Sequence, residues 1–323
     1  MPTAFLFPGQ GAQVVGMARD LYEEFTVARD VVDRANEVLD YNLADIMFGV
    51  GMDPADAAER LRQTNYTQPA LYVHSFAAWA VLRDAGAMPA CTAGHSLGEY
   101  SALAAAGALS FEDGLNAVRR RGEFMADANR ARSGGMMAIL GLDDDAATAV
   151  CDRVERQTGG TVRPANYNAP GQVVISGDVD AVAAAGRLAT EAGAQKVIPL
   201  VVGGAFHSPL MTDAAEGLSE VLNEIEVRTP VCPVFLNVTA EAVTEPEVIR
   251  ALLLEQLVSP VRWSQSVEAM HQFGVDQYVE VGTGKVLSGL AKRILDRSTV
   301  THQAGTAKEI RSFIATLKAA QDG

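Results

Sequence analysis

Residues 91–100 read CTAGHSLGEY, a short run of small and apolar residues that leads into the pattern Gly-x-Ser-x-Gly. Gly94, Ser96 and Gly98 occupy the fixed positions, and an alanine-rich stretch follows at 101–108. This order predicts a buried strand, a sharp turn and a helix, which is the geometry of a nucleophile elbow. The glycines are expected where a Cβ would clash with the crowded turn. Ser96 is therefore predicted at the tip of the turn, above a helix N-terminus whose free N–H groups favour negative charge.

The overall composition limits the number of domains and the kinds of partner that the protein is expected to have. The chain has 323 residues, 48% hydrophobic and 20% charged, which allows one large domain or two smaller ones with a sizeable core. Asp and Glu number 40 against 26 Lys and Arg, for a formal net charge of −14. Such an acidic chain is not expected to bind nucleic acid or an anionic membrane surface. We expect a monomer in which a local basic patch holds any acidic partner.

The three cysteines, Cys91, Cys151 and Cys232, are odd in number, far apart and without C-x-x-C spacing. This usage favours a reduced, cytoplasmic setting without a metal site. The N-terminus lacks a basic segment followed by an apolar run, so no secretory signal is expected. The alanine-rich helices are interrupted by charges and are too short to span a bilayer.

Strands and helices alternate along most of the chain. Residues 3–7 are an apolar run, the first expected buried strand, and a glycine-rich loop follows at 8–13. That loop lacks Gly-Lys-Ser/Thr and has the wrong spacing for G-x-G-x-x-G, so it matches neither phosphate-binding motif. Sequence patterns predict helices over 17–39, 55–61, 68–85, 111–131, 210–225, 250–257, 264–273, 286–295 and 307–319, and strands over 233–237 and 277–281. This order predicts a large α/β-hydrolase-like domain with a mostly parallel sheet covered on both faces.

Residues 135–200 follow a different pattern. Strands are expected over 136–142, 162–167, 172–176 and 196–200, and helices over 144–157 and 179–192. The order βαββαβ is that of a ferredoxin-like domain. We therefore predict a small ferredoxin-like domain, residues 133–202, inserted into a large catalytic domain formed by residues 1–132 and 203–323.

A serine nucleophile needs a base, because its hydroxyl is almost wholly protonated at neutral pH. The chain has five histidines, at positions 74, 95, 207, 271 and 302. His95 adjoins Ser96 on the turn, so their side chains are expected to diverge. His207 lies in the glycine-rich loop 203–209, just before a helix, and is our candidate base. No acid near His207 stands out, and a backbone carbonyl can accept its Nδ1–H instead. The N–H of Leu97 is one expected oxyanion donor, and the loop near Gln10 is a candidate for the second.

Several motifs together resemble one family. They are FPGQGAQ at 7–13, QPAL at 68–71, GHSLGEY at 94–100, RG at 121–122 with Met125, GAFHS at 204–208 and EVG at 280–282. In this order they resemble the malonyl-CoA:acyl carrier protein transacylases of type II fatty acid synthesis, and also the acyltransferase domains of polyketide synthases. The resemblance covers nearly the whole chain. One departure is Thr283, where the family often has proline, and it lies away from the expected chemistry.

The resemblance implies roles for the catalytic residues. Ser96 is the expected nucleophile and His207 the expected general base and acid. The main-chain carbonyl of Gln256 is expected to orient His207, which accounts for the missing acid. Gln10 and Leu97 are expected to donate main-chain N–H groups to the oxyanion.

The resemblance also implies the substrate-binding residues. Arg121 is expected to clamp the malonyl carboxylate in a bidentate pair, since a guanidinium stays charged. Phe206 is expected to crowd an α-methyl branch and so favour malonyl. The remaining residues expected at the site are Gln68, Met125, Asn166 and Asn168.

The implied reaction is a ping-pong transfer. Ser96 takes the malonyl group from malonyl-CoA and passes it to the phosphopantetheine thiol of acyl carrier protein, with no metal or other cofactor. Acyl carrier proteins are acidic, so we hypothesise that Lys285, Lys292 and Arg293 help to hold the carrier, although an ordinary solvated helix face explains them nearly as well.

Three alternatives stay open. An acyltransferase that loads polyketide carrier proteins in trans has a similar sequence. A serine thioesterase or hydrolase is disfavoured by Arg121 and by the lack of an acidic triad member. A non-catalytic module that binds carrier proteins is disfavoured by the intact Ser96 and His207.

Overall fold

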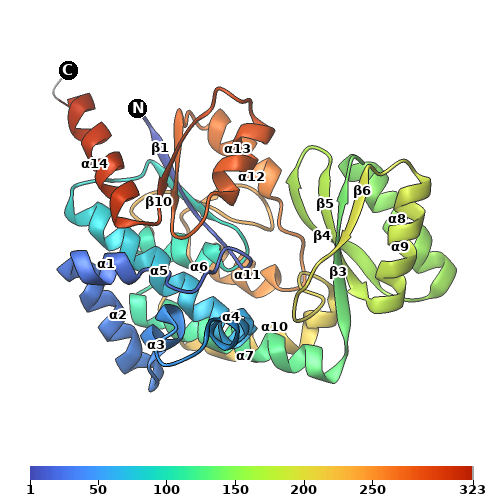
Figure 1. Ribbon diagram of the computed structural model, residues 1–323. Coiled ribbons are helices and arrows are strands. Elements are labelled where there is room, and N and C mark those ends of the chain that lie inside the picture. The colour runs from blue at the N-terminus through green and yellow to red at the C-terminus, as the bar shows by residue number, and fades with distance from the viewer. Residues whose placement is uncertain (322–323) are drawn as a thin grey trace.

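The computed structural model describes residues 1–321, in which two β-sheets lie side by side (Figure 1). The larger sheet has the strand order β10-β9-β1-β2-β7-β8. Its strands are β1 (Thr3–Phe7), β2 (Cys91–Gly94), β7 (Val234–Phe235), β8 (Ala242–Val243), β9 (Gln277–Val281) and β10 (Val300–Ala304). All neighbours are parallel except β8, which pairs with β7 in the antiparallel direction at one edge. The predicted mostly parallel sheet is confirmed.

Helices cover both faces of this sheet, which is why β1, β2 and β9 are buried along their whole length. Alternate residues of β1 point to opposite faces. Phe5 and Phe7 join a core with α5, whereas Ala4 and Leu6 join a second core with Trp263. The helices are α1 (Arg19–Glu24), α2 (Thr26–Leu39), α3 (Leu43–Phe48), α4 (Pro54–Arg62), α5 (Thr64–Asp84), α6 (Gly98–Ala105), α7 (Phe111–Ala131), α10 (Thr212–Glu224), α11 (Pro246–Gln256), α12 (Trp263–Gln272), α13 (Val286–Ile294) and α14 (Ala307–Gln321).

The smaller sheet has the order β4-β5-β3-β6, and all its neighbours are antiparallel. The chain runs through β3 (Gly134–Leu140), α8 (Asp144–Thr158), β4 (Val162–Ala169), β5 (Gln172–Asp178), α9 (Val179–Glu191) and β6 (Lys196–Pro199), which confirms the predicted βαββαβ order. Its helices share a separate apolar core with the sheet. The segment before α12 pairs with the smaller sheet, because Val261 exchanges backbone hydrogen bonds with Ala165 and Tyr167 of β4 at 2.8 and 2.9 Å.

Some predicted elements differ in the structure. The helix expected over 17–39 is two helices, because Phe25 is extended and ends α1, while Leu21 and Ala28 on either side pack into one core. The apolar periodicity therefore continued across the break. The helix α3 and the strands β8 and β10 were not predicted. In β10 only Ala304 is buried, so this edge strand carries no hydrophobic pattern.

No helix within residues 1–321 has the length and apolarity needed to cross a bilayer.

Candidate active site

The turn after β2 has the conformation of a nucleophile elbow. Ser96 has a φ of 52°, in the left-handed region that residues other than glycine rarely adopt. A Cβ on Gly94 would lie 1.9 Å from the backbone of Gly98, and one on Gly98 would lie 2.0 Å from the carbonyl oxygen of Phe7. The Gly-x-Ser-x-Gly pattern is thus required for the turn to pack closely on itself and on the end of β1.

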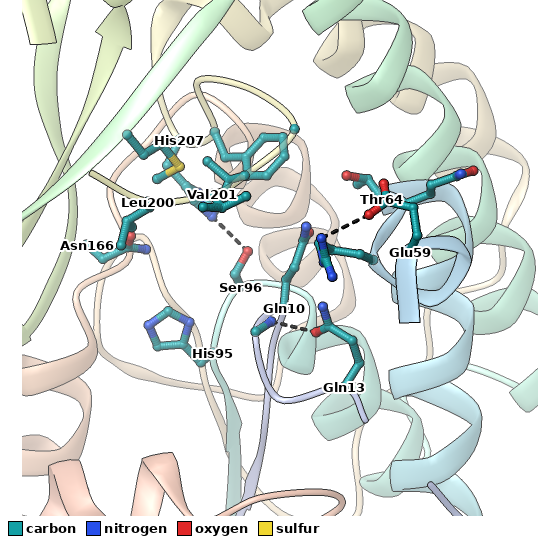
Figure 2. Close-up of a pocket in the computed structure, with 17 residues that line it drawn as sticks. Gln10, Gln13, Glu59, Thr64, His95, Ser96, Asn166, Leu200, Val201 and His207 are labelled. Atoms are coloured by element: carbon teal, nitrogen blue, oxygen red, sulfur yellow. Dashed lines mark hydrogen bonds and ion pairs between the residues drawn. The ribbon is translucent and has the colours of Figure 1, made fainter. Parts of the chain in front are cut away.

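The Ser96 hydroxyl faces His207. Ser96 Oγ lies 2.7 Å from His207 Nε2, and Figure 2 shows the two side chains directed at each other across the cavity. His207 Nδ1 lies 2.9 Å from the carbonyl oxygen of Gln256 and 3.2 Å from that of Ser259. Because carbonyls only accept hydrogen bonds, Nδ1 carries the proton and Nε2 presents its lone pair to the serine. The structure therefore brings together the predicted nucleophile, base and orienting carbonyl.

His207 is held in its neutral form. Burial, and after it the positive charge of Arg121, lowers the pKa of His207 to about 3. His207 also has a positive φ, 57°, so both members of the pair adopt a rare backbone conformation. Such conformations cluster at functional sites, where the surrounding structure compels them.

Arg121 of α7 is buried directly beneath the serine. Its guanidinium donates to Ser96 Oγ at 3.1 Å, to Gln68 Oε1 at 2.9 Å and to Gln256 Oε1 at 3.0 Å. The side chain is only 1% exposed, and burial lowers its pKa. Among the ion pairs of the described residues, none involves Arg121. A buried cation without a carboxylate partner is costly, and an anionic ligand beside Ser96 would relieve that cost.

The other predicted residues surround this centre. Gln68 is held by Met125, whose sulfur accepts from Gln68 Nε2 at 3.1 Å, and both are buried. A cavity of 370 Å³ opens at the serine, and Phe206, Asn166 and Gln10 line it with Ser96 and His207. Leu97, Arg121, Gln68, Met125 and Gln256 do not line this cavity. Nevertheless Arg121 reaches the serine hydroxyl from below, so the two groups form one site.

Two backbone N–H groups are free to serve as oxyanion donors. Within residues 1–321, the N–H groups of Gln10 and Leu97 have no backbone acceptor outside the regular elements. The loop that carries Gln10 packs tightly on the elbow, since a Cβ on Gly9 would lie 2.3 Å from the carbonyl oxygen of His95. His95 itself turns away from Ser96, as its position beside the nucleophile predicted (Figure 2). Its ring hydrogen-bonds Asn168 at 2.8 Å.

Four groups that contribute to this centre were not predicted from the sequence. They are the carbonyl of Ser259, the side chain of Gln256, the buried carboxyl of Glu99 and the side chain of Asn237. Asn237 carried a usable signal, because it ends a predicted strand, and the carboxyl ends of parallel strands gather at one edge of a sheet. The other three follow from no local pattern.

Comparisons with known proteins agree with this geometry. A family model described as the acyl transferase domain matches residues 4–320. The chain is 46% identical to the malonyl CoA-acyl carrier protein transacylase of Bacillus subtilis over 319 residues, covering 99% of this chain and 98% of that protein. The crystal structure of the acyl-carrier-protein-S-malonyltransferase from Bartonella henselae superimposes with a TM-score of 0.92 at 38% identity, over 98% of this chain and all (100%) of the other.

A further similar structure is a complex. It contains a type II PKS acyl carrier protein with its malonyl-transacylase and matches with a TM-score of 0.91 at 38% identity, over 98% of this chain and 100% of that chain. The family match spans almost the whole chain, and the identities far exceed what a shared fold alone requires. The chain therefore belongs to the acyl transferase family and, within it, to the malonyl-CoA:acyl carrier protein transacylases.

Proposed function

We propose that this protein transfers a malonyl group from malonyl-CoA to the phosphopantetheine thiol of acyl carrier protein, through an ester on Ser96. The observation that carries the proposal is the buried, unpaired guanidinium of Arg121, 3.1 Å from Ser96 Oγ. A malonyl group places a carboxylate two carbons from the reacting carbonyl, where the guanidinium can pair with it in a bidentate fashion. A neutral acyl group would leave the buried charge unpaired.

The first half-reaction forms the ester. His207 Nε2 takes the hydroxyl proton as Ser96 Oγ attacks the thioester carbonyl carbon. The N–H groups of Gln10 and Leu97 hold the resulting oxyanion. When it collapses, the carbon–sulfur bond breaks, and the imidazolium returns the proton to the departing thiolate of coenzyme A. His207 is neutral again, and the malonyl group remains on Ser96.

The second half-reaction reverses these steps with a new thiol. The phosphopantetheine thiol gives its proton to His207, its sulfur attacks the ester carbonyl, and Ser96 recovers the proton as the ester bond breaks. The malonyl carboxylate also strengthens the base. The charge of Arg121 is one cause of the low pKa of His207, so a carboxylate that pairs with Arg121 offsets that cause. Substrate binding thereby prepares His207 to accept a proton.

Water must compete poorly for the ester, or the protein would be a thioesterase. We assign this exclusion to the small domain, residues 133–202, which sits against the catalytic domain formed by 1–132 and 203–323. Asn166 of β4 and the segment 200–203 line the cavity at Ser96 from that side. Orientation by Arg121 adds to the exclusion, because an anchored acyl group presents its carbonyl to the oxyanion donors in one pose.

The carrier protein is assigned to the exposed side of α13, from its N-cap to its last turn. Lys285, Lys292 and Arg293 are exposed there, next to the exposed Val286 and Gly289, on a chain whose formal net charge is −14. We call these five residues the α13 patch. A second cavity of 240 Å³ borders the patch at Val286 and shares Gln10, His95 and Asn166 with the cavity at Ser96. The patch thus combines positive charge for an acidic carrier with a path toward the nucleophile.

The reaction is assigned to the cytoplasm. The three thiols, Cys91, Cys151 and Cys232, are free and buried, which fits a reducing, cytoplasmic compartment. The mechanism needs only the two substrates and the residues described, so no cofactor is assigned.

The test isolates the intermediate. Wild-type protein and Ser96→Ala are mixed briefly with malonyl-CoA, and intact-protein mass spectrometry follows the mass of each. We expect one malonyl adduct on wild type only, and its loss when carrier protein with a phosphopantetheine arm is added, together with a matching gain on the carrier. Steady release of coenzyme A without an adduct or transfer would make the protein a thioesterase. Transfer only to polyketide carrier proteins would favour the polyketide alternative.

A further inference from the structure

The backbone at Ser96 needs support from outside the elbow. Its φ of 52° is unfavourable for a residue with a Cβ, and such conformations persist only where neighbouring groups impose them. The position of Oγ relative to His207 Nε2 depends directly on this dihedral angle. Groups that hold the peptide units on either side of Ser96 therefore control where the nucleophile points.

Two side-chain amides hold these peptide units. Asn237 Oδ1 accepts from the N–H of Ser96 at 2.8 Å, and Asn237 Nδ2 donates to the carbonyl of Gly94 at 2.7 Å. Gln256 Nε2 donates to the carbonyl of Ser96 at 3.0 Å. Asn237 thus spans the elbow from the residue before the turn to the nucleophile, and Gln256 holds the following peptide.

Asn237 is itself firmly held. Its N–H donates to Glu99 Oε2 at 2.6 Å, and its carbonyl accepts from the N–H of Arg262 at 2.9 Å. All four of its polar groups are engaged, and the residue is only 1% exposed. Glu99 belongs to α6, the helix that follows the elbow, and is fully buried. The contact with Arg262 leads to Val261, which pairs with β4 of the smaller sheet.

We propose that Asn237 is a positioning residue for the nucleophile, whose side-chain amide holds Ser96 in the left-handed conformation, with Glu99 holding Asn237 in turn. The inference rests on the proposed function only for the identity of the acyl group. Asn237 does not line the cavity at Ser96, so it acts on the reaction through the backbone of Ser96. Removing its amide leaves Arg121 and the cavity in place and loosens the nucleophile.

The experiment compares Asn237→Ala and Asn237→Asp with wild type in single-turnover acylation by malonyl-CoA. Misplacing a reacting atom by about 1 Å costs on the order of 100-fold in rate, so we expect the alanine variant to acylate about 10- to 100-fold more slowly. The concentration of malonyl-CoA that gives half the maximal rate should change less than about twofold, because Arg121 is untouched. The aspartate variant keeps an acceptor for the Ser96 N–H but sets an oxygen against the Gly94 carbonyl in place of the Nδ2 donor, so it should also acylate more slowly than wild type.

A second reagent separates this inference from the malonyl assignment. Phenylmethylsulfonyl fluoride sulfonylates an activated serine with loss of fluoride and carries no carboxylate. We expect its rate on Asn237→Ala to fall by a factor similar to that for malonyl-CoA. If malonyl-CoA labels neither protein, the proposed function fails, and the sulfonylation rates still decide the role of Asn237.

Three further variants guard against a general effect on folding. Asn36→Ala is the matched control, because Asn36 Oδ1 accepts from the N–H of Ala44 at 3.2 Å, away from the site. It should lower the melting temperature without slowing acylation. Glu99→Gln keeps an oxygen for the Asn237 N–H and should acylate within about threefold of wild type, whereas Glu99→Ala should be slow. The proposal would be overturned if folded Asn237→Ala acylated and sulfonylated at wild-type rates. It would also be overturned if the malonyl-CoA concentration at half the maximal rate changed while the maximal rate did not.

Discussion

Replacing Arg121 with alanine is the sharpest test of the acyl-group assignment. The guanidinium is 1% exposed and donates to three acceptors around Ser96, none of which is a carboxylate. If the malonyl carboxylate binds as proposed, the guanidinium gains a buried, bidentate ion pair. Breaking such a pair by removing one partner costs about 3 to 5 kcal/mol. Since each 1.4 kcal/mol is tenfold, kcat/KM for malonyl-CoA should fall about 100- to 4,000-fold.

Acetyl-CoA provides the internal control for this variant. Acetyl lacks the carboxylate, so the wild-type protein must bury Arg121 unpaired when acetyl occupies the site. Arg121→Ala removes that charge, and kcat/KM for acetyl-CoA should stay level or rise. The rate at which the Ser96 ester forms can be measured with both substrates in one assay, by rapid quench and intact-protein mass spectrometry. Arg121→Lys keeps the positive charge but loses the planar guanidinium that can donate two parallel hydrogen bonds, so it should retain only part of the preference for malonyl.

The result that would refute the reasoning is an equal fall for both substrates. It would mean that Arg121 supports the site as a whole, through Gln68 and Gln256, and does not recognise a carboxylate.

Three other predictions follow from the same structure. Because the pKa of His207 is lowered to about 3, its neutral form persists to low pH, so kcat/KM for acylation should be level between about pH 5 and 8; a rate profile that bends near pH 6.5 would show an unperturbed histidine. Burial raises the pKa of Glu99 to about 8, above its unfolded value, so its contribution to stability is complete below about pH 4.3 and is lost as pH rises through about 8. The melting temperature of wild type should therefore fall more steeply from pH 5 to 8.5 than that of Glu99→Gln, and parallel curves would exclude this role. Replacing both Lys292 and Arg293 with glutamate should raise KM for the carrier protein several-fold and leave Ser96 acylation by malonyl-CoA unchanged; an unchanged KM would place the docking surface elsewhere.

Local patterns in the sequence predicted the elements that need few distant neighbours. Gly94, Ser96 and Gly98 predicted the elbow, because the pattern is local in sequence and the clash at Gly94 arises within the turn itself, although the clash at Gly98 is with the end of β1. The helix expected over 111–131 has the same bounds as α7, since Ser110 caps its N-terminus and its apolar face repeats at helical spacing. The βαββαβ order was likewise predictable, because each of its elements is short and bounded by turn residues. The break at Phe25 and the edge strand β10 left no such pattern.

The centre of the site depended on contacts between distant parts of the chain. Ser96 meets His207, 111 positions away, and the side chain of Gln256, 160 positions away. No spacing rule distinguishes Arg121 from Arg119 and Arg120, and its role came from family resemblance alone. In the structure, Arg121 is buried under the elbow while the other two remain partly exposed.

The sequence by itself determined which residues can perform the chemistry and the turn that exposes the nucleophile. Only the tertiary structure decided what surrounds that turn. The larger sheet places β2 between β1 and β7. Gln10 follows β1 and Asn237 follows β7, so the two residues approach Ser96 from opposite sides. Periodicity records contacts within one helix or strand, whereas the order of strands in a sheet follows from burying all of them together. The support of Ser96 by Asn237, Glu99 and Gln256 is a product of that packing.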